Sequence, residues 1–171
     1  MNVPVFDIDS LGLGMTLQDR GRTGWRRFGV PTSGWMDDHA ATWANRLLDN
    51  PPGAAVLELL VQGATLRALD DVWVAITGAD CDCNITKWRA IRIGEGEIIH
   101  FSHTNSGLWS YLAVEGGFAA ETIFGSRSTY ARGHLGRVLS AGDILARNTQ
   151  HSFSLPAGVA GRAVPWSETR N

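Results

Sequence analysis

Cysteine is scarce in this 171-residue sequence, which contains two, Cys81 and Cys83. If the segment is extended, both side chains point to the same face, too close in sequence for an ordinary structural disulfide. We interpret them as reduced thiols. A metal site would need two further ligands, and the nearest candidates, His100 and His103, do not form a familiar zinc spacing with the cysteines. We therefore predict that the chain holds no metal.

The sequence also lacks a strong net charge, which is −2, with acidic and basic residues spread along the chain. This balance gives no electrostatic reason to expect nucleic acid or an anionic membrane as a partner. The first ten residues lack the basic and then apolar pattern of a signal peptide. The longest apolar runs, such as residues 54–61, are far too short to span a bilayer. We expect a cytoplasmic protein that binds neither nucleic acid nor membranes.

Internal repeats and low-complexity tracts are missing too, and the length suits one domain with a sizeable core. We place this domain at residues 1–147. Residues 148–171 contain several glycines and prolines with little periodicity, so we predict a tail or linker there.

Short segments with a period of two dominate the chain and are rich in β-branched and aromatic residues. They begin at Val3, Thr65, Val72, Ile91, Ile98 and Trp109. Turn residues separate them at 70–71, 94–96, 105–107 and 116–117. This spacing is typical of a β-barrel or sandwich, and it predicts a mainly β domain.

A single segment, from about Met36 to Leu48, has the pattern of a helix. Its apolar residues recur at intervals of three and four, and Asn50, Pro51 and Pro52 end it. The stripe consists of Met36, Ala40, Trp43, Ala44, Leu47 and Leu48. We interpret it as core.

The loop before this helix crowds turn-forming residues directly ahead of Asp37 and Asp38. Asp37 can cap the helix, and both charges suit the positive end of its dipole. Alternatively, Gly29, Pro31, Ser33 and Gly34 form a ligand loop, in which the two glycines let the backbone approach a bound group closely. The residues alone favour capping.

Other candidate site residues lie in two polar, glycine-containing stretches. The first, residues 18–27, holds four arginines that could bind a carboxylate or phosphate, or form a solvated rim paired with nearby aspartates. The second, residues 125–137, suits a long loop on a β scaffold, where sites concentrate. Residues 77–80 end an apolar strand with a polar residue, which is expected where a strand emerges at the mouth of a barrel. No catalytic triad can be assigned.

Glu58 interrupts an otherwise apolar strand. Its side chain either faces solvent or is a buried carboxyl with a partner and a shifted pKa, and the second case would mark a site.

Several blocks resemble, in order, the N-terminal part of the biotin-dependent carboxyltransferase-like family, which includes the C subunit of 5-oxoprolinase and the second subunit of allophanate hydrolase. The blocks are residues 16–50, 55–67, 74–80, 111–118 and 125–133, followed by 141–145. The resemblance implies a cyclophilin-like β-barrel with one principal α-helix, and it shifts the interpretation of the loop before the helix towards ligand binding. With Glu58, the expected substrate-binding residues are Gln18, Asp19, Arg22, Pro31, Ser33, Gly34, Asp37, Ser126, Ser128 and Arg132.

Members of this family are usually about twice as long and have a second barrel-like half. The resemblance implies an incomplete subunit that acts on a small carboxylated amide or lactam together with a B-like cyclophilin-fold subunit. ATP or carboxybiotin would enter in a complete complex, and we expect neither on this chain. The alternative is a non-catalytic module that binds another cyclophilin-like subunit or a copy of itself as a homodimer.

Overall fold

Antiparallel strands form most of the computed structural model, which describes residues 2–60, 62–148, 162–165 and 169. The strands are β1 (Asn2–Leu11), β2 (Gly14–Gln18), β3 (Val56–Leu60), β4 (Ala64–Ala68), β5 (Val72–Cys83), β6 (Ala90–Ile93), β7 (Ile98–Val114) and β8 (Ile144–Asn148). One α-helix, α1 (Asp38–Leu47), packs against them. The prediction of a mainly β fold with one principal helix is confirmed.

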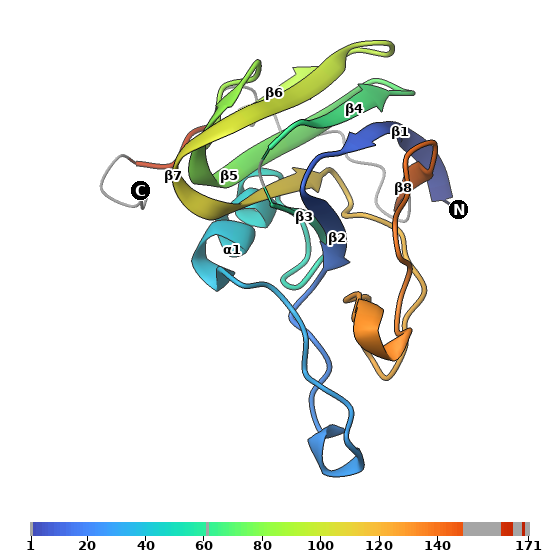
Figure 1. The fold of residues 1–171 in the computed structure, drawn as a ribbon. Helices are drawn as coiled ribbons and strands as arrows, with labels where there is room; N and C mark the ends of the chain where they lie inside the picture. Colours follow the sequence, from blue (N-terminus) through green and yellow to red (C-terminus); the bar gives the residue numbers. More distant parts are fainter. Residues whose placement is uncertain (1, 61, 149–161, 166–168, 170–171) are drawn as a thin grey trace.

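The long strand β7 links the parts of the sheet (Figure 1). Its first residues pair with β4 and its last residues with β3, while β5 pairs along most of its length. The strand order is β2-β3-β7-β4-β1-β8, and β6 lies beside β5. The sheet curls around a core in which Phe6, Phe101 and Phe118 are fully buried. This curled sheet is the scaffold from which the site loops extend.

Helix α1 packs through small residues against β5 and β7. Asp37 is its N-cap and accepts a hydrogen bond from Ala40 N at 3.0 Å, so the capping interpretation is confirmed. Ala40, Ala44 and Leu47 are buried as predicted. Met36 is not part of the core stripe, because it precedes the helix and is 66% exposed.

The predicted turn at residues 105–107 is wrong, because β7 continues through it. The facing strand β5 absorbs the irregularity with register shifts between Gly78 and Cys83. Gly78 adopts φ 94°, and a Cβ there would lie 2.4 Å from Trp109 O. The glycine bulge in β5 thus allows β7 to run as one continuous strand where the sequence predicts two.

Residues 77–80 also differ from the prediction of a strand end at a barrel mouth, since they lie inside β5. Thr77 is buried, and its hydroxyl donates to Ala40 O at 2.7 Å, so it supports the helix. Cys81 and Cys83, further along β5, are both free thiols, as predicted. Burial raises the pKa of Cys83 to about 11, which keeps this thiol protonated.

Part of the predicted tail packs on the domain. Val164 is buried in the cluster around α1, and Arg162 forms an ion pair with Asp49 at 2.7 Å. Most of the predicted tail, residues 149–161, 166–168 and 170–171, lies outside the described residues. Within the described ranges, no helix is long and apolar enough to cross a membrane.

Candidate binding site beneath two neighbouring loops

The segment between β2 and α1 forms a long loop that projects from one end of the barrel (Figure 1). Its two limbs are joined by backbone hydrogen bonds, from Arg22 N to Thr32 O at 2.7 Å and from Trp35 N to Asp19 O at 3.2 Å. Gly21 lies between the limbs at φ 82°, where a Cβ would come within 2.6 Å of Thr32 O. Glycine is required there for the limbs to approach so closely.

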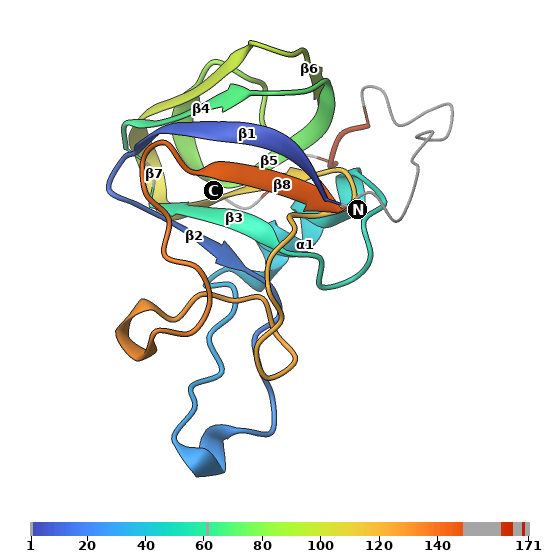
Figure 2. The ribbon, with the colours of Figure 1, turned by 90° about the vertical axis from the view of Figure 1, so that its right-hand side faces the viewer.

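A second loop, between β7 and β8, projects from the same end and lies beside the first (Figure 2). Asp19 joins the two. Its carboxylate accepts hydrogen bonds from Gly21 N at 2.8 Å, from the hydroxyls of Ser126 and Ser128 at 2.6 and 2.7 Å, and from Arg127 N at 2.6 Å. Burial raises the pKa of Asp19, but these hydrogen bonds together outweigh it and hold the pKa below its ordinary value. Asp19 is therefore an ionised carboxylate that links the two loops through hydrogen bonds.

Arg22 is the second connection, and its side chain is 1% exposed. The guanidinium donates to Ser33 Oγ at 3.1 Å, to Ser128 O, and to Ile123 O at 3.5 Å. All three acceptors are neutral. The structure thus places Arg22 between the two loops as a buried support, and its guanidinium is turned to protein acceptors.

Glu58 is a buried carboxyl with partners, the alternative that would mark a site. It is 4% exposed, and its Oε2 accepts from Met36 N at 2.8 Å and from the Tyr111 hydroxyl at 2.9 Å. The β3–β7 register sets Tyr111 directly opposite Glu58. Burial raises the pKa of Glu58, and the bonds from Met36 and Tyr111 offset this only in part. The pKa of Tyr111 is raised by burial and by the neighbouring acid, so the phenol keeps its proton and donates it.

Glu58 borders a hollow of about 290 Å³ on the barrel side of the first loop. The lining residues are Gly14, Met15, Thr16, Gln18, Ser33, Gly34, Met36, Glu58, Leu60, Trp109 and Thr129. Gln18 fixes the shape of this hollow, since its amide accepts from Gly34 N at 3.2 Å and donates to Thr16 Oγ1 and Thr129 O. The hollow therefore combines one protonatable carboxyl with neutral polar groups and an apolar wall.

Ser33 links the hollow to the buried arginine behind it. It lies at φ 54°, a left-handed conformation that costs a non-glycine residue energy and is concentrated at functional sites. Its Oγ accepts from Arg22, and within the described part of the chain it donates to no acceptor. The hydroxyl hydrogen of Ser33 is thus available to a ligand oxygen in the hollow.

The predicted site residues fall into three groups. Gln18, Ser33, Gly34 and Glu58 line the hollow. Asp19, Arg22, Ser126 and Ser128 form the hydrogen-bonded framework between the loops. Pro31, Asp37 and Arg132 do not line the hollow. Asp37 caps α1, Pro31 lies within the first loop, and Arg132 is exposed on a 3₁₀ turn of the second.

Sequence reasoning missed Tyr111, Trp109, Thr16 and Thr129. Tyr111 and Thr16 both pair with Glu58, on opposite sides of β3. The apolar neighbours of Glu58 were visible in the sequence, but the pairing of β3 with β2 and β7 was not. Among the described residues, no group of three or more His, Cys, Asp or Glu side chains could hold a metal ion.

Comparison with known proteins shows which family this chain is similar to. The family described as carboxyltransferase domain, subdomain A and B, matches residues 28–170. The chain is 32% identical to the C subunit of 5-oxoprolinase from Haemophilus influenzae over 97% of its length and 58% of that protein. It is 36% identical to urea amidolyase of Lachancea kluyveri, over 88% of its length but 9% of that protein.

A solved structure gives the same result for the fold. The crystal structure of the Kluyveromyces lactis urea carboxylase matches all of this chain with a TM-score of 0.84 and 31% identity. The match covers 16% of that protein. The chain thus corresponds to one part of considerably longer relatives.

Proposed function

The chain belongs to the carboxyltransferase domain family, subdomains A and B, and from this we propose that it forms one wall of a binding site for a small carboxylated amide or lactam. Glu58 carries the proposal, because a buried carboxyl with a raised pKa borders a hollow of small-molecule size. The chain spans 58% of the Haemophilus influenzae 5-oxoprolinase relative. In this proposal, turnover requires partner subunits or domains.

In this proposal Glu58 accepts a hydrogen bond from the amide or lactam N–H of the ligand. Its raised pKa suits it to hold or release a proton near the reacting nitrogen. Ser33 donates its hydroxyl to a ligand oxygen, and the charge of Arg22 behind Ser33 stabilises negative charge on that oxygen. Trp109 and Met36 offer apolar surface on one side of the ligand.

ATP and carboxybiotin belong to the complete complex in this proposal. The lining of the hollow contains a carboxyl and no lysine or arginine, so it does not fit a triphosphate. We assign no cofactor to this chain.

Calorimetric titration of 5-oxoproline into the wild-type chain and Glu58→Gln tests the site. We expect saturable binding that is weaker by roughly tenfold or more in the variant, the loss typical of a hydrogen bond to a charged group. Ser140→Ala, at an exposed position outside the hollow, is the control and should bind like wild type. Equal affinity of Glu58→Gln and wild type would remove Glu58 from the site.

A turnover assay with ATP and 5-oxoproline, with and without A-like and B-like partner subunits, tests the dependence on partners. Product formed by the isolated chain would contradict it.

A cluster of exposed rings supports a second candidate function, docking of a cyclophilin-like partner or a second copy. Trp25 and Phe28 lie at the tip of the first loop, and Phe124 of the second loop joins them, with ring centroids 5.9 and 4.7 Å from that of Trp25. Phe28 is 63% exposed and Phe124 42%. Exposed aromatic clusters favour protein interfaces.

A further inference from the structure

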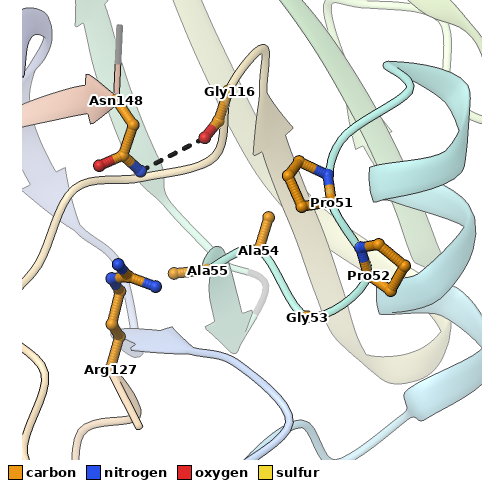
Figure 3. Close-up of a pocket in the computed structure, with 8 residues that line it drawn as sticks. All are labelled: Pro51, Pro52, Gly53, Ala54, Ala55, Gly116, Arg127 and Asn148. Carbon is orange, nitrogen blue, oxygen red and sulfur yellow. Dashed lines mark hydrogen bonds between the residues drawn. The ribbon is translucent and has the colours of Figure 1, made fainter. Parts of the chain in front are cut away.

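A second hollow, of about 220 Å³, lies beside the turn between α1 and β3 (Figure 3). Pro51, Pro52 and Gly53 form one side, Ala54 and Ala55 the floor, and Gly116, Asn148 and Arg127 the other side. None of these residues lines the hollow beside Glu58. The two hollows are therefore separate.

Arg127 supplies the positive charge of this second hollow. Its side chain reaches towards Ala55 from below Asn148 (Figure 3). Two hydrogen bonds fix the residue, from Nε to Ala120 O at 3.2 Å and from the backbone N to Asp19 Oδ2 at 2.6 Å. Within the described residues, no acceptor binds either terminal nitrogen of the guanidinium. The guanidinium of Arg127 is thus half-buried and held in one orientation, and its two terminal nitrogens can donate to a ligand.

Arg147 precedes Asn148 on β8 and differs from Arg127 in its partners. Arg147 forms ion pairs with Glu115 and with Asp70, the latter at 3.0 Å. Arg127 has no carboxylate within ion-pair distance of its guanidinium among the described residues. Its charge therefore lacks the internal compensation that Arg147 has.

We propose that this hollow binds the carboxylate group of a small molecule, held by the fork of Arg127. A planar guanidinium matches the two oxygens of a carboxylate in geometry and charge. Pro51, Ala54 and Ala55 offer an apolar wall for a short aliphatic part of the ligand. The fixed Nε leaves the terminal nitrogens to make the contact without further ordering of the side chain.

Titration with propionate, followed by ¹H–¹⁵N spectra at constant ionic strength, tests the proposal. We expect saturable shifts of the backbone amides of Gly53, Ala55 and Gly116 in the wild-type chain. Propionamide, a neutral molecule of similar shape, should not produce them. Arg127→Gln should weaken the binding roughly tenfold or more, the loss typical of a charge-assisted contact. Arg137→Gln, on the same loop but paired with Asp143 at 2.6 Å, should bind propionate like wild type.

The backbone bond to Asp19 survives any substitution of Arg127, so the variants should fold, which the same spectra report. Arg127→Lys keeps the charge without the fork, and we expect it to bind between wild type and Arg127→Gln. Unchanged affinity in Arg127→Gln, equal binding of propionamide, or tighter binding of inorganic phosphate than of propionate would each overturn the proposal. Glu58→Gln should leave the propionate titration unaltered, so this proposal and the proposed function can fail separately.

Discussion

Asp19 and Ser128 exchange two hydrogen bonds across 109 residues of sequence. Ser128 Oγ donates to Asp19 Oδ1 at 2.7 Å and accepts from Asp19 N at 3.0 Å. The carbonyl of Ser128 also accepts from the guanidinium of Arg22. A single serine thus connects a buried carboxylate and a buried cation, and it joins the two loops that border the candidate site.

Ser128→Ala should lower the free energy of unfolding by about 1–3 kcal/mol, because it leaves Asp19 N and one carboxylate bond without a partner in a buried position. Urea unfolding at pH 7 measures this. Ser140→Ala, an exposed serine of the same loop, should stay within about 0.5 kcal/mol of wild type. Equal stability of Ser128→Ala and wild type would mean that water replaces the serine.

Arg22→Ala should lower the stability of the fold, because Arg22 is a buried support of the two loops. The change removes the donor to Ser128 O and Ser33 Oγ and opens a buried space, so we expect a loss of at least about 1–3 kcal/mol in the free energy of unfolding. Thermal melts of wild type and Arg22→Ala measure it, with Arg132→Ala, exposed on the second loop, as the matched control. An unchanged melt combined with lost binding of 5-oxoproline would instead make Arg22 a direct ligand residue.

The behaviour of Arg22 shows where prediction from the sequence stops. The starts of β1, β4, β5, β6 and β7, to within one residue, and α1 followed from periodicity and turn residues, since these are local properties of the chain. The start expected at Trp109 did not, because that residue lies inside β7. That Arg22 is buried, and that Asp19 meets Ser126 and Ser128, depends on how two loops separated by about a hundred residues fold against each other. Local pattern contains no such information.

The same limit applies to β7 and to Tyr111. A strand that passes through Asn105–Gly107 requires bulges in its partner β5, which are a property of the pair. Glu58 could be singled out as unusual from its apolar neighbours. Its partner could not be identified, because the β3–β7 register decides that Tyr111 faces it.

Asp19→Asn should be less stable than wild type at pH 7 and approach it in acid. The folded pKa of Asp19 lies below the ordinary value of about 4, so its stabilisation is present above pH 4 and is lost as the pH falls through the lower folded value. Urea unfolding at pH 7, 5, 4 and 3 should show the difference narrowing below pH 4. Glu121→Gln, which also removes one acidic charge but at an exposed position of the second loop, is the matched control and should be about as stable as wild type at pH 7. A stability difference between Asp19→Asn and wild type that is constant with pH would contradict an ionised Asp19 linking the loops.

Glu58→Gln should show the opposite trend. The folded pKa of Glu58 lies above its ordinary value of about 4.3, so ionising it costs stability progressively as the pH rises from that value to the raised one. Glutamine has no such cost, and its amide oxygen can still accept from Met36 N and the Tyr111 hydroxyl. The variant should therefore gain stability relative to wild type between pH 4 and 7, measured by urea unfolding. Parallel pH profiles would contradict the raised pKa.

Phe28→Ser should weaken self-association without changing stability. Phe28, Trp25 and Phe124 form an exposed ring cluster at the tips of the projecting loops, and Arg27 lies 4.7 Å from the ring centroid of Phe28. None of the three belongs to the buried core, so their packing suits a partner surface. Light scattering over a range of concentrations should show a wild-type dimer that dissociates in Phe28→Ser. The control is Leu108→Ser, 58% exposed on β7, which should remain dimeric. A wild-type monomer at every concentration would contradict self-association, and a dimer unaffected by Phe28→Ser would place the contact elsewhere on the barrel.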